Sequence, residues 1–275
     1  MIVYATLTQL RQRLSIPDGD TADDGRLLVA LRQATAQIDR YTVRRFAPVV
    51  QTRRYDYQSP YSLRLDIDLL ELLALTNGDG TALDLSAAEL LPTGDGPKSA
   101  ILLDVGAGAP FTYGLVPDAA IQVRGIWGWH DVWSQAWQDS SDAVADDPLS
   151  ADASTVTVSD ADGADAAGES PRFQVGQLLR IADEYLHVTA VDAAANTLSA
   201  IRGVRGTTAA SHAQGTPIEV YRPPLDVQAL CLRWAVWLYQ QVNAGIGAGA
   251  DWLYPPDLPP DVQRLAEGLR RLRVA

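Results

Sequence analysis

The chain contains 275 residues, which is long for one domain and short for three, and 47% of them are hydrophobic, enough for a sizeable core. It carries 22 basic and 34 acidic side chains, a net charge of −12 at pH 7, which disfavours a protein that clamps duplex DNA. The single cysteine, Cys231, excludes an intrachain disulfide and a zinc cluster built from cysteines, and no apolar run approaches the roughly 20 residues that cross a bilayer.

The first quarter of the chain has the pattern of two helices. Thr6 and Gln9 have the spacing of a capping box, and the residue before a proline avoids helical geometry, so we expect a short helix that ends before Ile16. A second helix is predicted to begin at Asp20–Thr21, because apolar residues then recur every three or four positions. These residues are Leu27, Leu28, Leu31, Ala34, Ile38 and Tyr41. The chain starts without a basic segment followed by a long apolar one, so we expect no signal peptide.

After Pro48 the pattern changes from helices to strands. Short apolar runs alternate with glycine- and proline-rich spacers, and Asn77–Gly80 is a strong hairpin turn. We therefore predict an antiparallel β region over residues 49–129.

The next segment is notable for its charge. Residues 125–171 contain ten acidic and no basic side chains, so most of the acidic excess lies in the middle of the chain. Such asymmetry favours one strongly negative face or loop system. We interpret residues 130–153, which are rich in Asp, Ser and Ala, as an acidic linker.

The last part of the chain returns from strands to helices. Short strands at about ten-residue spacing over residues 154–223 predict an inserted small β-barrel or sandwich domain. A helix follows Pro224, and a final helix begins at Asp261. We expect residues 1–48 and 224–275 to form one helical bundle, and hence an α+β protein in which the two ends of the chain pack together.

The sequence contains no convincing catalytic, cofactor or metal motif. Residues 94–99 and 245–249 are rich in glycine, but neither segment has the strand–loop–helix context of a phosphate loop. The aspartates of residues 160–165 do not follow the ligand order of a calcium loop, and we interpret them as a solvated turn. The three histidines lack zinc-site spacing, and no GxSxG motif is present. We therefore predict a protein that is not an enzyme and needs no cofactor or metal.

Several segments resemble head–tail connector proteins of tailed bacteriophages, also called adaptor or head completion proteins. The resemblance covers the helix from Asp20 to Phe46, which ends in IDRYTVRRF, the strand with Arg53-Arg54-Tyr55, and the strand-end sequence VRGIWGWHD of residues 123–131. A further group of segments is similar to a small β module of phage structural proteins. This group comprises FQVGQLLRI (173–181), Glu184–Leu186, Arg202–Ala209 and His212.

The resemblance implies a ring, commonly of twelve copies, that lies under the portal vertex of the virion. Its partners would be further copies of the chain, the portal protein, and a stopper or tail-completion protein, with no membrane involved. DNA would cross the central channel without specific binding, and the protein would be in the host cytoplasm during assembly.

The predicted site residues follow from charge and from the family pattern. A closed ring needs contacts between two different faces of a subunit, and arginine-rich and acidic faces would complement each other. We predict that the inter-subunit arginines are Arg40, Arg44, Arg45, Arg53 and Arg54. The family pattern suggests that the last helix contacts the portal through Val262, Leu265, Leu269, Arg270, Arg271, Leu272 and Arg273. Acidic residues facing the channel would include Asp66, Asp68 and Glu71, or part of residues 125–171, because acidic walls repel DNA.

Two other functions fit the sequence less well. A carbohydrate-binding module of a phage tail or baseplate would use the tryptophans, of which Trp127, Trp129, Trp133 and Trp137 lie close together in sequence. A cell-wall hydrolase would need a pair of carboxylates in a cleft, and no spacing selects such a pair.

Overall fold

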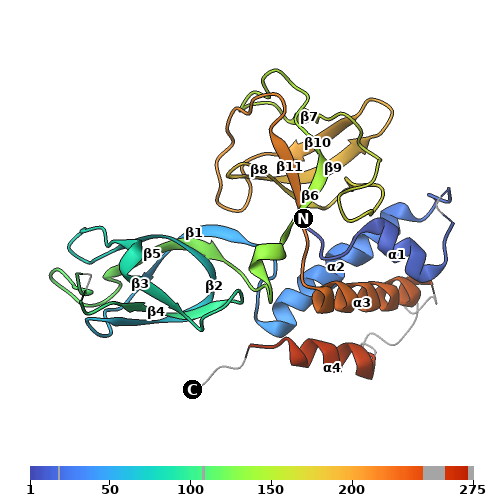
Figure 1. Ribbon diagram of the computed structural model, residues 1–275. Coiled ribbons are helices and arrows are strands. Elements are labelled where there is room, and N and C mark those ends of the chain that lie inside the picture. The colour runs from blue at the N-terminus through green and yellow to red at the C-terminus, as the bar shows by residue number, and fades with distance from the viewer. Residues whose placement is uncertain (18, 107–108, 244–257, 272–275) are drawn as a thin grey trace. The chain divides into compact units, whose positions relative to one another are not determined.

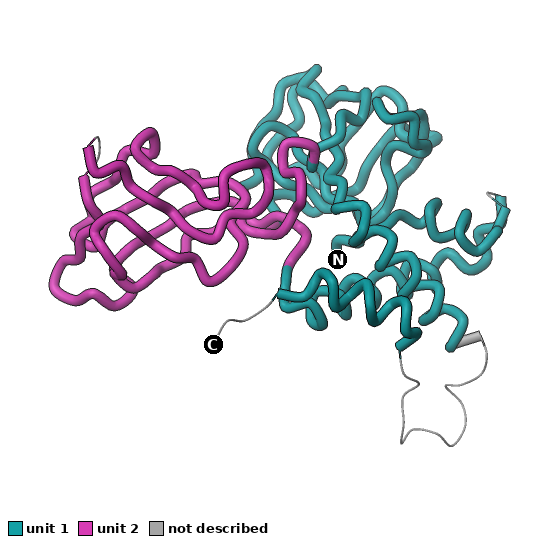
Figure 2. Tube along the Cα trace, turned by 60° about the horizontal axis from the view of Figure 1, so that its bottom comes forward, with its two compact units in different colours: residues 1–44, 136–204, 208–275 teal, residues 45–135, 205–207 magenta. Residues whose placement is uncertain are grey.

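The computed structural model describes residues 1–17, 19–106, 109–243 and 258–271. These residues form two compact units (Figure 2): unit 1 comprises residues 1–44, 136–204 and 208–275, and unit 2 comprises residues 45–135 and 205–207. The described residues contain four α-helices and two antiparallel sheets, so the predicted α+β class is confirmed. No helix among them is both long and apolar enough to cross a membrane.

The helices of unit 1 come from both ends of the chain (Figure 1). They are α1 (Leu7–Leu14), α2 (Asp24–Thr42), α3 (Leu225–Asn243) and α4 (Pro260–Gly268). In the predicted capping box of α1, Thr6 Oγ1 accepts a bond from the Gln9 amide at 3.2 Å, and Gln9 Oε1 accepts one from the Thr6 amide at 3.0 Å. Helix α2 begins later than predicted, because Asp20 accepts a bond from the Ala22 amide within a turn that precedes the helix.

The core of the helical part lies between α2 and α3. Leu31 and Ile38 of α2 are fully buried, as are Leu230 and Cys231 of α3, and α4 contacts both of these helices. The segments before Phe46 and after Pro224 therefore share one bundle, in which each helix buries its apolar stripe.

The second part of unit 1 is a six-stranded sheet, here called the β lobe (residues 137–221). Its order is β6-β11-β8-β9-β10-β7. The strands are β6 (Trp137–Ala143), β7 (Thr155–Thr157), β8 (Leu178–Ile181), β9 (Glu184–Asp192), β10 (Thr197–Ile201) and β11 (Pro217–Tyr221). Strand β6 lies within the segment predicted as an acidic linker and pairs with β11. The strand order is open, and no ladder joins β6 to β7 among the described residues, so the predicted barrel is not confirmed.

The start of the chain connects the β lobe to the helices. The Val3 amide donates to the Gly176 carbonyl at 3.0 Å, and the Thr8 amide donates to Oε1 of Gln174 at 3.1 Å. Gly176 has a φ of +93°, and a Cβ at this position would lie 2.8 Å from the Val3 side chain. Glycine is therefore needed for this close approach.

Unit 2 is a five-stranded sheet of order β1-β5-β2-β4-β3. Its strands are β1 (Val49–Tyr55), β2 (Ser62–Thr76), β3 (Ala88–Leu91), β4 (Lys98–Leu103) and β5 (Ile121–Trp127), with short 3₁₀ turns at Leu85–Ala87 and Trp133–Gln135. Leu69, Ile101, Val123 and Trp127 belong to its buried core. A Cβ on Gly125 would lie 2.5 Å from the Glu71 carbonyl oxygen, so only glycine lets β5 approach β2 so closely.

Candidate functional site

The predicted inter-subunit arginines belong to both units, and the two on β1 lie on opposite faces of their sheet. Arg40 is exposed on the last turn of α2, Arg44 is half-buried, and Arg45 is exposed at the start of unit 2. Arg53 and Arg54 are neighbours on β1 and so belong to opposite faces of the sheet. The Arg53 guanidinium lies 5.3 Å from the ring centre of Trp127 on the core face, whereas Arg54 is exposed on the other face.

The outer face of this sheet carries a second arginine that the sequence prediction missed. In the antiparallel register Arg54 pairs with Gln122, and Thr52 pairs with Arg124. Arg54 and Arg124 are therefore diagonal neighbours on one face, and both are exposed. The signal was available in the sequence, because Ile121 and Val123 point inward and the period of two sends Gln122 and Arg124 outward.

The predicted channel-facing carboxylates all belong to β2. Asp66 is exposed and accepts a bond from the Tyr55 hydroxyl at 2.8 Å. Burial of Tyr55, together with this bond, raises the pKa of the Tyr55 hydroxyl well above its usual value. Asp68 is half-buried, and Glu71 is exposed with its Oε2 3.5 Å from Nε1 of Trp133. Pairing along β2 shifts register between Arg64 and Leu69 and again before Glu71, so the three carboxylates lie at irregular positions.

The predicted portal-contact residues of α4 divide into buried and exposed ones. Val262 is 1% exposed and packs within the bundle, while Leu265 and Leu269 are half-buried. The Arg271 amide donates to the Thr42 carbonyl at 2.9 Å, which ties the end of α4 to the end of α2. Arg270 is exposed, and Leu272 and Arg273 lie outside the described residues. The apolar face of α4 therefore stabilises unit 1, and its exposed side remains for a partner.

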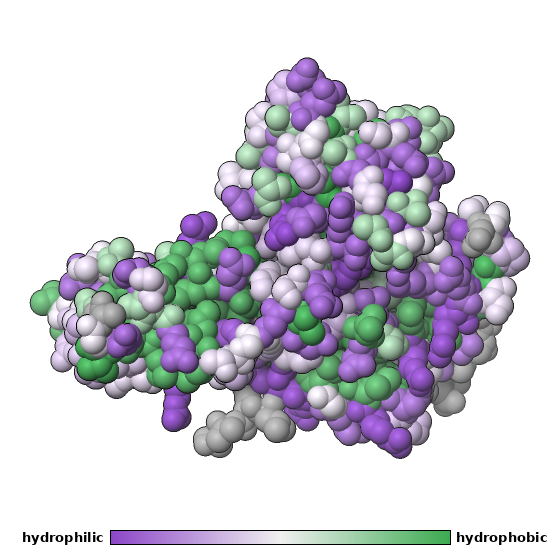
Figure 3. All heavy atoms as spheres, in the orientation of Figure 1, coloured by the Kyte–Doolittle hydropathy of each residue, from purple (hydrophilic) through white to green (hydrophobic). Residues whose placement is uncertain are grey.

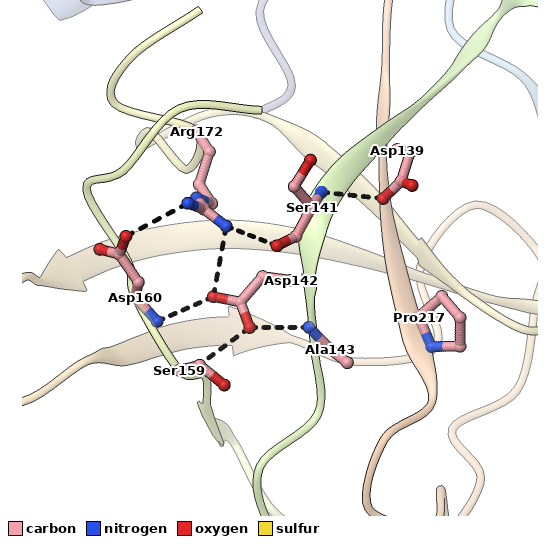
Figure 4. Close-up of a pocket in the computed structure, with 8 residues that line it drawn as sticks. All are labelled: Asp139, Ser141, Asp142, Ala143, Ser159, Asp160, Arg172 and Pro217. Atoms are coloured by element: carbon pink, nitrogen blue, oxygen red, sulfur yellow. Dashed lines mark hydrogen bonds and ion pairs between the residues drawn. The ribbon is translucent and has the colours of Figure 1, made fainter. Parts of the chain in front are cut away.

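The loops of the acidic segment, which lie between and after β6 and β7, pack against the buried Arg172 and the half-buried Arg222. An open depression of about 530 Å³ is lined by Asp139, Asp142, Asp160 and Arg172, together with Ser141, Ala143, Ser159 and Pro217 (Figure 4). Arg172 donates to the Ser141 carbonyl at 2.7 Å and lies 3.7 Å from Asp142 and 3.2 Å from Asp160. Asp142 also accepts bonds from the amides of Ser159 and Asp160.

The second arginine, Arg222, pairs with Asp165 and with Glu169. Within residues 160–165, Asp160 therefore pairs with Arg172 and Asp165 with Arg222, whereas Asp162 is exposed. Among the described residues no group of His, Cys, Asp and Glu side chains could hold a metal ion.

The β lobe contains a cluster of buried charged residues. They belong to the segments that resemble a small β module of phage structural proteins. Glu184 is 2% exposed, and its two oxygens accept bonds from Arg202 at 2.6 and 2.7 Å. Oε2 also lies 2.8 Å from Nε2 of His212, and the amides of Gly203 and Ala210 donate to this carboxylate at 3.0 Å. Burial raises the pKa of Glu184, but the bonds from Arg202, Ala210 and His212 outweigh it and hold this pKa below its usual value.

Lys98 and Cys231 both have structural surroundings that disfavour a chemical role. Lys98 Nζ donates to the carbonyl oxygens of Pro92 and Gly94, which ties up the lysine of the segment 94–99. Cys231 is buried, and burial raises the pKa of its thiol to about 11, so the reactive thiolate is disfavoured. The other glycine-rich segment, 245–249, lies outside the described residues.

The tryptophans that suggested a carbohydrate site have separate packing partners. Trp127 is 1% exposed in the core of unit 2. Trp137 lies on the β lobe, where the Arg180 guanidinium is 4.7 Å from its ring centre and Tyr185 and Tyr221 pack against it. Because Arg180 lies over this ring and pairs with Glu219 at 2.6 Å, a sugar that stacks on this side of the ring would have to displace the arginine and break that ion pair.

One loop of unit 2 exposes several large apolar side chains. Tyr113, Leu115 and Val116 are 48%, 102% and 61% exposed. The loop is held by Asn77, which accepts a bond from the Thr112 amide and donates to the Pro110 carbonyl. In the view of Figure 3, hydrophobic residues gather over unit 2 and over the helices more than over the β lobe. Exposed apolar side chains on an anchored backbone are typical of an interaction surface.

Comparisons with known proteins give one structural likeness. No family model matches the chain, and no curated protein matches it. Among solved structures, the chain is similar to a chain from the neck of an empty GTA particle computed with C6 symmetry. The TM-score is 0.42 and the identity 13%, over 99% of this chain and 92% of that chain.

Proposed function

We propose that this chain is a structural virion protein of the head–tail connector type. Its copies form a ring, of twelve by the sequence resemblance, between the portal of a phage head and the tail or stopper. DNA passes through this ring, and the chain performs no catalysis.

The proposal rests on one observation: the segments that resemble connector proteins all serve to build the fold. The sequence IDRYTVRRF ends α2 and leads into β1, and VRGIWGWHD begins with the second half of β5, the strand between β1 and β2. Glu184, Arg202 and His212 form the ion cluster of the β lobe. These sequences therefore build a scaffold, and none of them presents a nucleophile or an acid–base pair in a cleft, as expected of a protein that works by assembly.

The proposed channel wall includes Asp66, Asp68 and Glu71 of β2. Duplex DNA carries one negative charge per about 1.7 Å, so carboxylates on the wall repel its phosphates and let it slide. A ring structure with these three carboxylates on the outer perimeter would contradict this part of the proposal and leave the ring itself intact.

The proposed portal contact is the exposed side of α4 and the residues that follow it. Deletion of residues 259–275 would also uncover the bundle, because Val262 and Ala266 are buried there. Arg270→Glu is a sharper test, since Arg270 is exposed. We expect this variant to stay folded and to sediment less with portal rings, while Arg13→Glu, an exposed position on α1 outside the proposed contact, keeps normal binding.

The proposal as a whole is tested by electron microscopy of the full chain with its cognate portal protein. Rings of the chain docked on the portal are expected. A chain that stays monomeric and never binds the portal would overturn the proposal. Turnover of peptidoglycan, or glycan binding that is lost in Trp133→Ala, would favour one of the two other functions.

A further inference from the structure

The outer face of the unit 2 sheet carries two like charges side by side. Arg54 and Arg124 are diagonal neighbours on β1 and β5, next to the uncharged residues Thr52, Gln122 and Ala74. Glu71 of β2 pairs with Ile126, two positions along β5 from Arg124, and it is exposed. Neither guanidinium has an acidic partner within the part of the chain that the structure describes. Adjacent like charges on a sheet are unfavourable unless an anionic group lies between them. This pair, here called the arginine face, therefore suits a negatively charged partner.

Two kinds of partner present such charges: nucleic acid and acidic protein surfaces. Residues 45–135 contain eleven acidic and six basic side chains, and the whole chain carries −12. The field of such a protein repels a polyanion and weakens its binding to phosphates. A protein surface with a few carboxylates carries a much lower density of negative charge than a nucleic acid, so the acidic residues of unit 2 repel it less. The arginine face therefore fits protein carboxylates better than DNA.

The chain itself carries a matching surface. The depression of Figure 4 is open, and its three carboxylates outnumber its one arginine. Asp142 accepts bonds from two backbone amides and lies beside Arg172, and its side chain is only 2% exposed. It is therefore not available to a partner. Asp139 and Asp162 are exposed, and the side chain of Asp160 is 51% exposed although it pairs with Arg172. Asp139 accepts a bond from the Ser141 amide and Asp160 pairs with Arg172, but all three carboxylates keep exposed oxygens that a further basic group could reach. These three carboxylates are here called the acidic rim.

We propose that the arginine face of one copy binds the acidic rim of the next copy. This inference rests on the proposed ring, and it names the two surfaces that meet. The contact joins two different surfaces, so each copy can bind two neighbours, one through each surface, as a ring of identical copies requires. Charge complementarity of this kind sets the register of neighbours and the rate of assembly.

The test uses two full-length variants with opposite charge changes. Arg54→Glu with Arg124→Glu reverses the arginine face, and Asp139→Arg with Asp162→Arg reverses the acidic rim. All four positions are exposed, but Asp139 accepts a bond from the Ser141 amide at 2.8 Å. We therefore expect the wild-type melting temperature for the first variant and a small decrease for the second. Each variant alone brings like charges together between copies, and we expect the fraction of chains in rings to fall at least about tenfold.

An equimolar mixture of the two variants should form rings again. In an alternating ring, glutamates of the first variant meet arginines of the second, and the arginine face of the second meets the unchanged rim of the first. The quadruple variant in one chain gives the same result for any number of copies. Arg64→Glu, an exposed arginine of β2 in the same unit, is the matched control and should assemble normally.

The outcomes separate this inference from the proposed function. If the wild-type chain forms no ring with its portal, the proposed function fails. If the wild type forms rings and either double variant does so equally well, the inference is wrong and the ring stands. Loss of assembly without recovery in the mixture or in the quadruple variant would refute the pairing of these two surfaces. Wild-type binding to duplex DNA that is abolished by Arg54→Glu with Arg124→Glu would instead assign the arginine face to nucleic acid.

Discussion

The β lobe of unit 1 and the sheet of unit 2 use their charged residues in opposite ways. In the β lobe, carboxylates are folded inward onto arginines, as Glu184 is onto Arg202 and Asp165 is onto Arg222. In unit 2 the core is apolar, and charged side chains such as Arg54 and Arg124 remain exposed on the sheet.

The difference matters because buried and exposed charges contribute differently. Removal of one partner from a buried ion pair leaves an uncompensated charge and destabilises the fold, whereas an exposed charge contributes little to stability. We therefore expect substitutions in the charged motif of the β lobe to lower stability, and substitutions of exposed charges in unit 2 to affect assembly instead. The motif that contains Glu184, Arg202 and His212 thus has a structural role.

The largest expected effect comes from the buried cluster of the β lobe. Glu184→Gln removes a carboxylate that accepts bonds from Arg202, His212 and two amides, and we expect unit 1 to lose about 3–5 kcal/mol of stability. Calorimetry of the full chain measures this loss. Glu89→Gln, an exposed glutamate of unit 2, should change stability by less than about 0.5 kcal/mol, and equal losses in the two variants would contradict the comparison.

The next effect concerns backbone packing in unit 2. Gly125→Ala places a Cβ 2.5 Å from the Glu71 carbonyl oxygen and from Leu69 Cδ1, so β5 must move away from β2. We expect a loss of about 3 kcal/mol in unit 2 while unit 1 melts normally. The control is Gly96→Ala, where the nearest atom is 3.5 Å away. A fully stable Gly125→Ala variant would show that this pairing is looser than described.

A smaller effect separates the two neighbouring arginines of β1. Arg53→Ala loses the contact with the Trp127 ring and should cost about 0.5–1 kcal/mol of stability without affecting assembly. Arg54→Ala should leave stability unchanged and weaken assembly. Thermal melts and sedimentation of the two variants measure both properties. If instead Arg53→Ala weakened assembly and Arg54→Ala lowered stability, Arg53 and not Arg54 would be the arginine on the outer face.

The smallest expected effect is a dependence on acid pH in the β lobe. Burial, with the neighbouring Met1 ammonium 3.3 Å from Nε2, lowers the pKa of His187 below its usual 6.5. The unfolded chain therefore binds a proton that the folded chain rejects, so stability is complete above pH 6.5 and falls as the pH drops from there toward the lowered pKa. Chemical unfolding at pH 7.5 and 5.5 should show this loss in the wild type and a weaker one in His187→Gln. An identical pH dependence in both would exclude His187 as its source.

Much of the fold could be predicted from local sequence signals. The capping box of Thr6 and Gln9, the apolar period of α2 and the turn at Asn77–Gly80 all depend on residues close together in the chain. Such signals specify helices and hairpins before any tertiary contact forms. Strand β6 was missed for the opposite reason. Its residues Asp139–Asp142 favour turns, and pairing with β11 makes them a strand.

The candidate surfaces were harder to predict, because they depend on which side of an element each residue occupies. Arg53 and Arg54 looked like one basic group, yet the period of two separates them, and register with β5 brings Arg124 to Arg54 instead. The acidic segment looked uniformly solvated. Arg172 and Arg222, distant in sequence from most of its aspartates, bury part of it, and only tertiary structure reveals this pairing.

The central claim is assembly through unlike surfaces around an opening, and mass photometry of the full chain with its cognate portal protein tests it most directly. We predict a discrete, closed species with a fixed number of copies per portal, which disappears when the arginine face is reversed and returns in the mixture of complementary variants. A chain that remains a single copy at every concentration and salt, with or without the portal, would contradict the account.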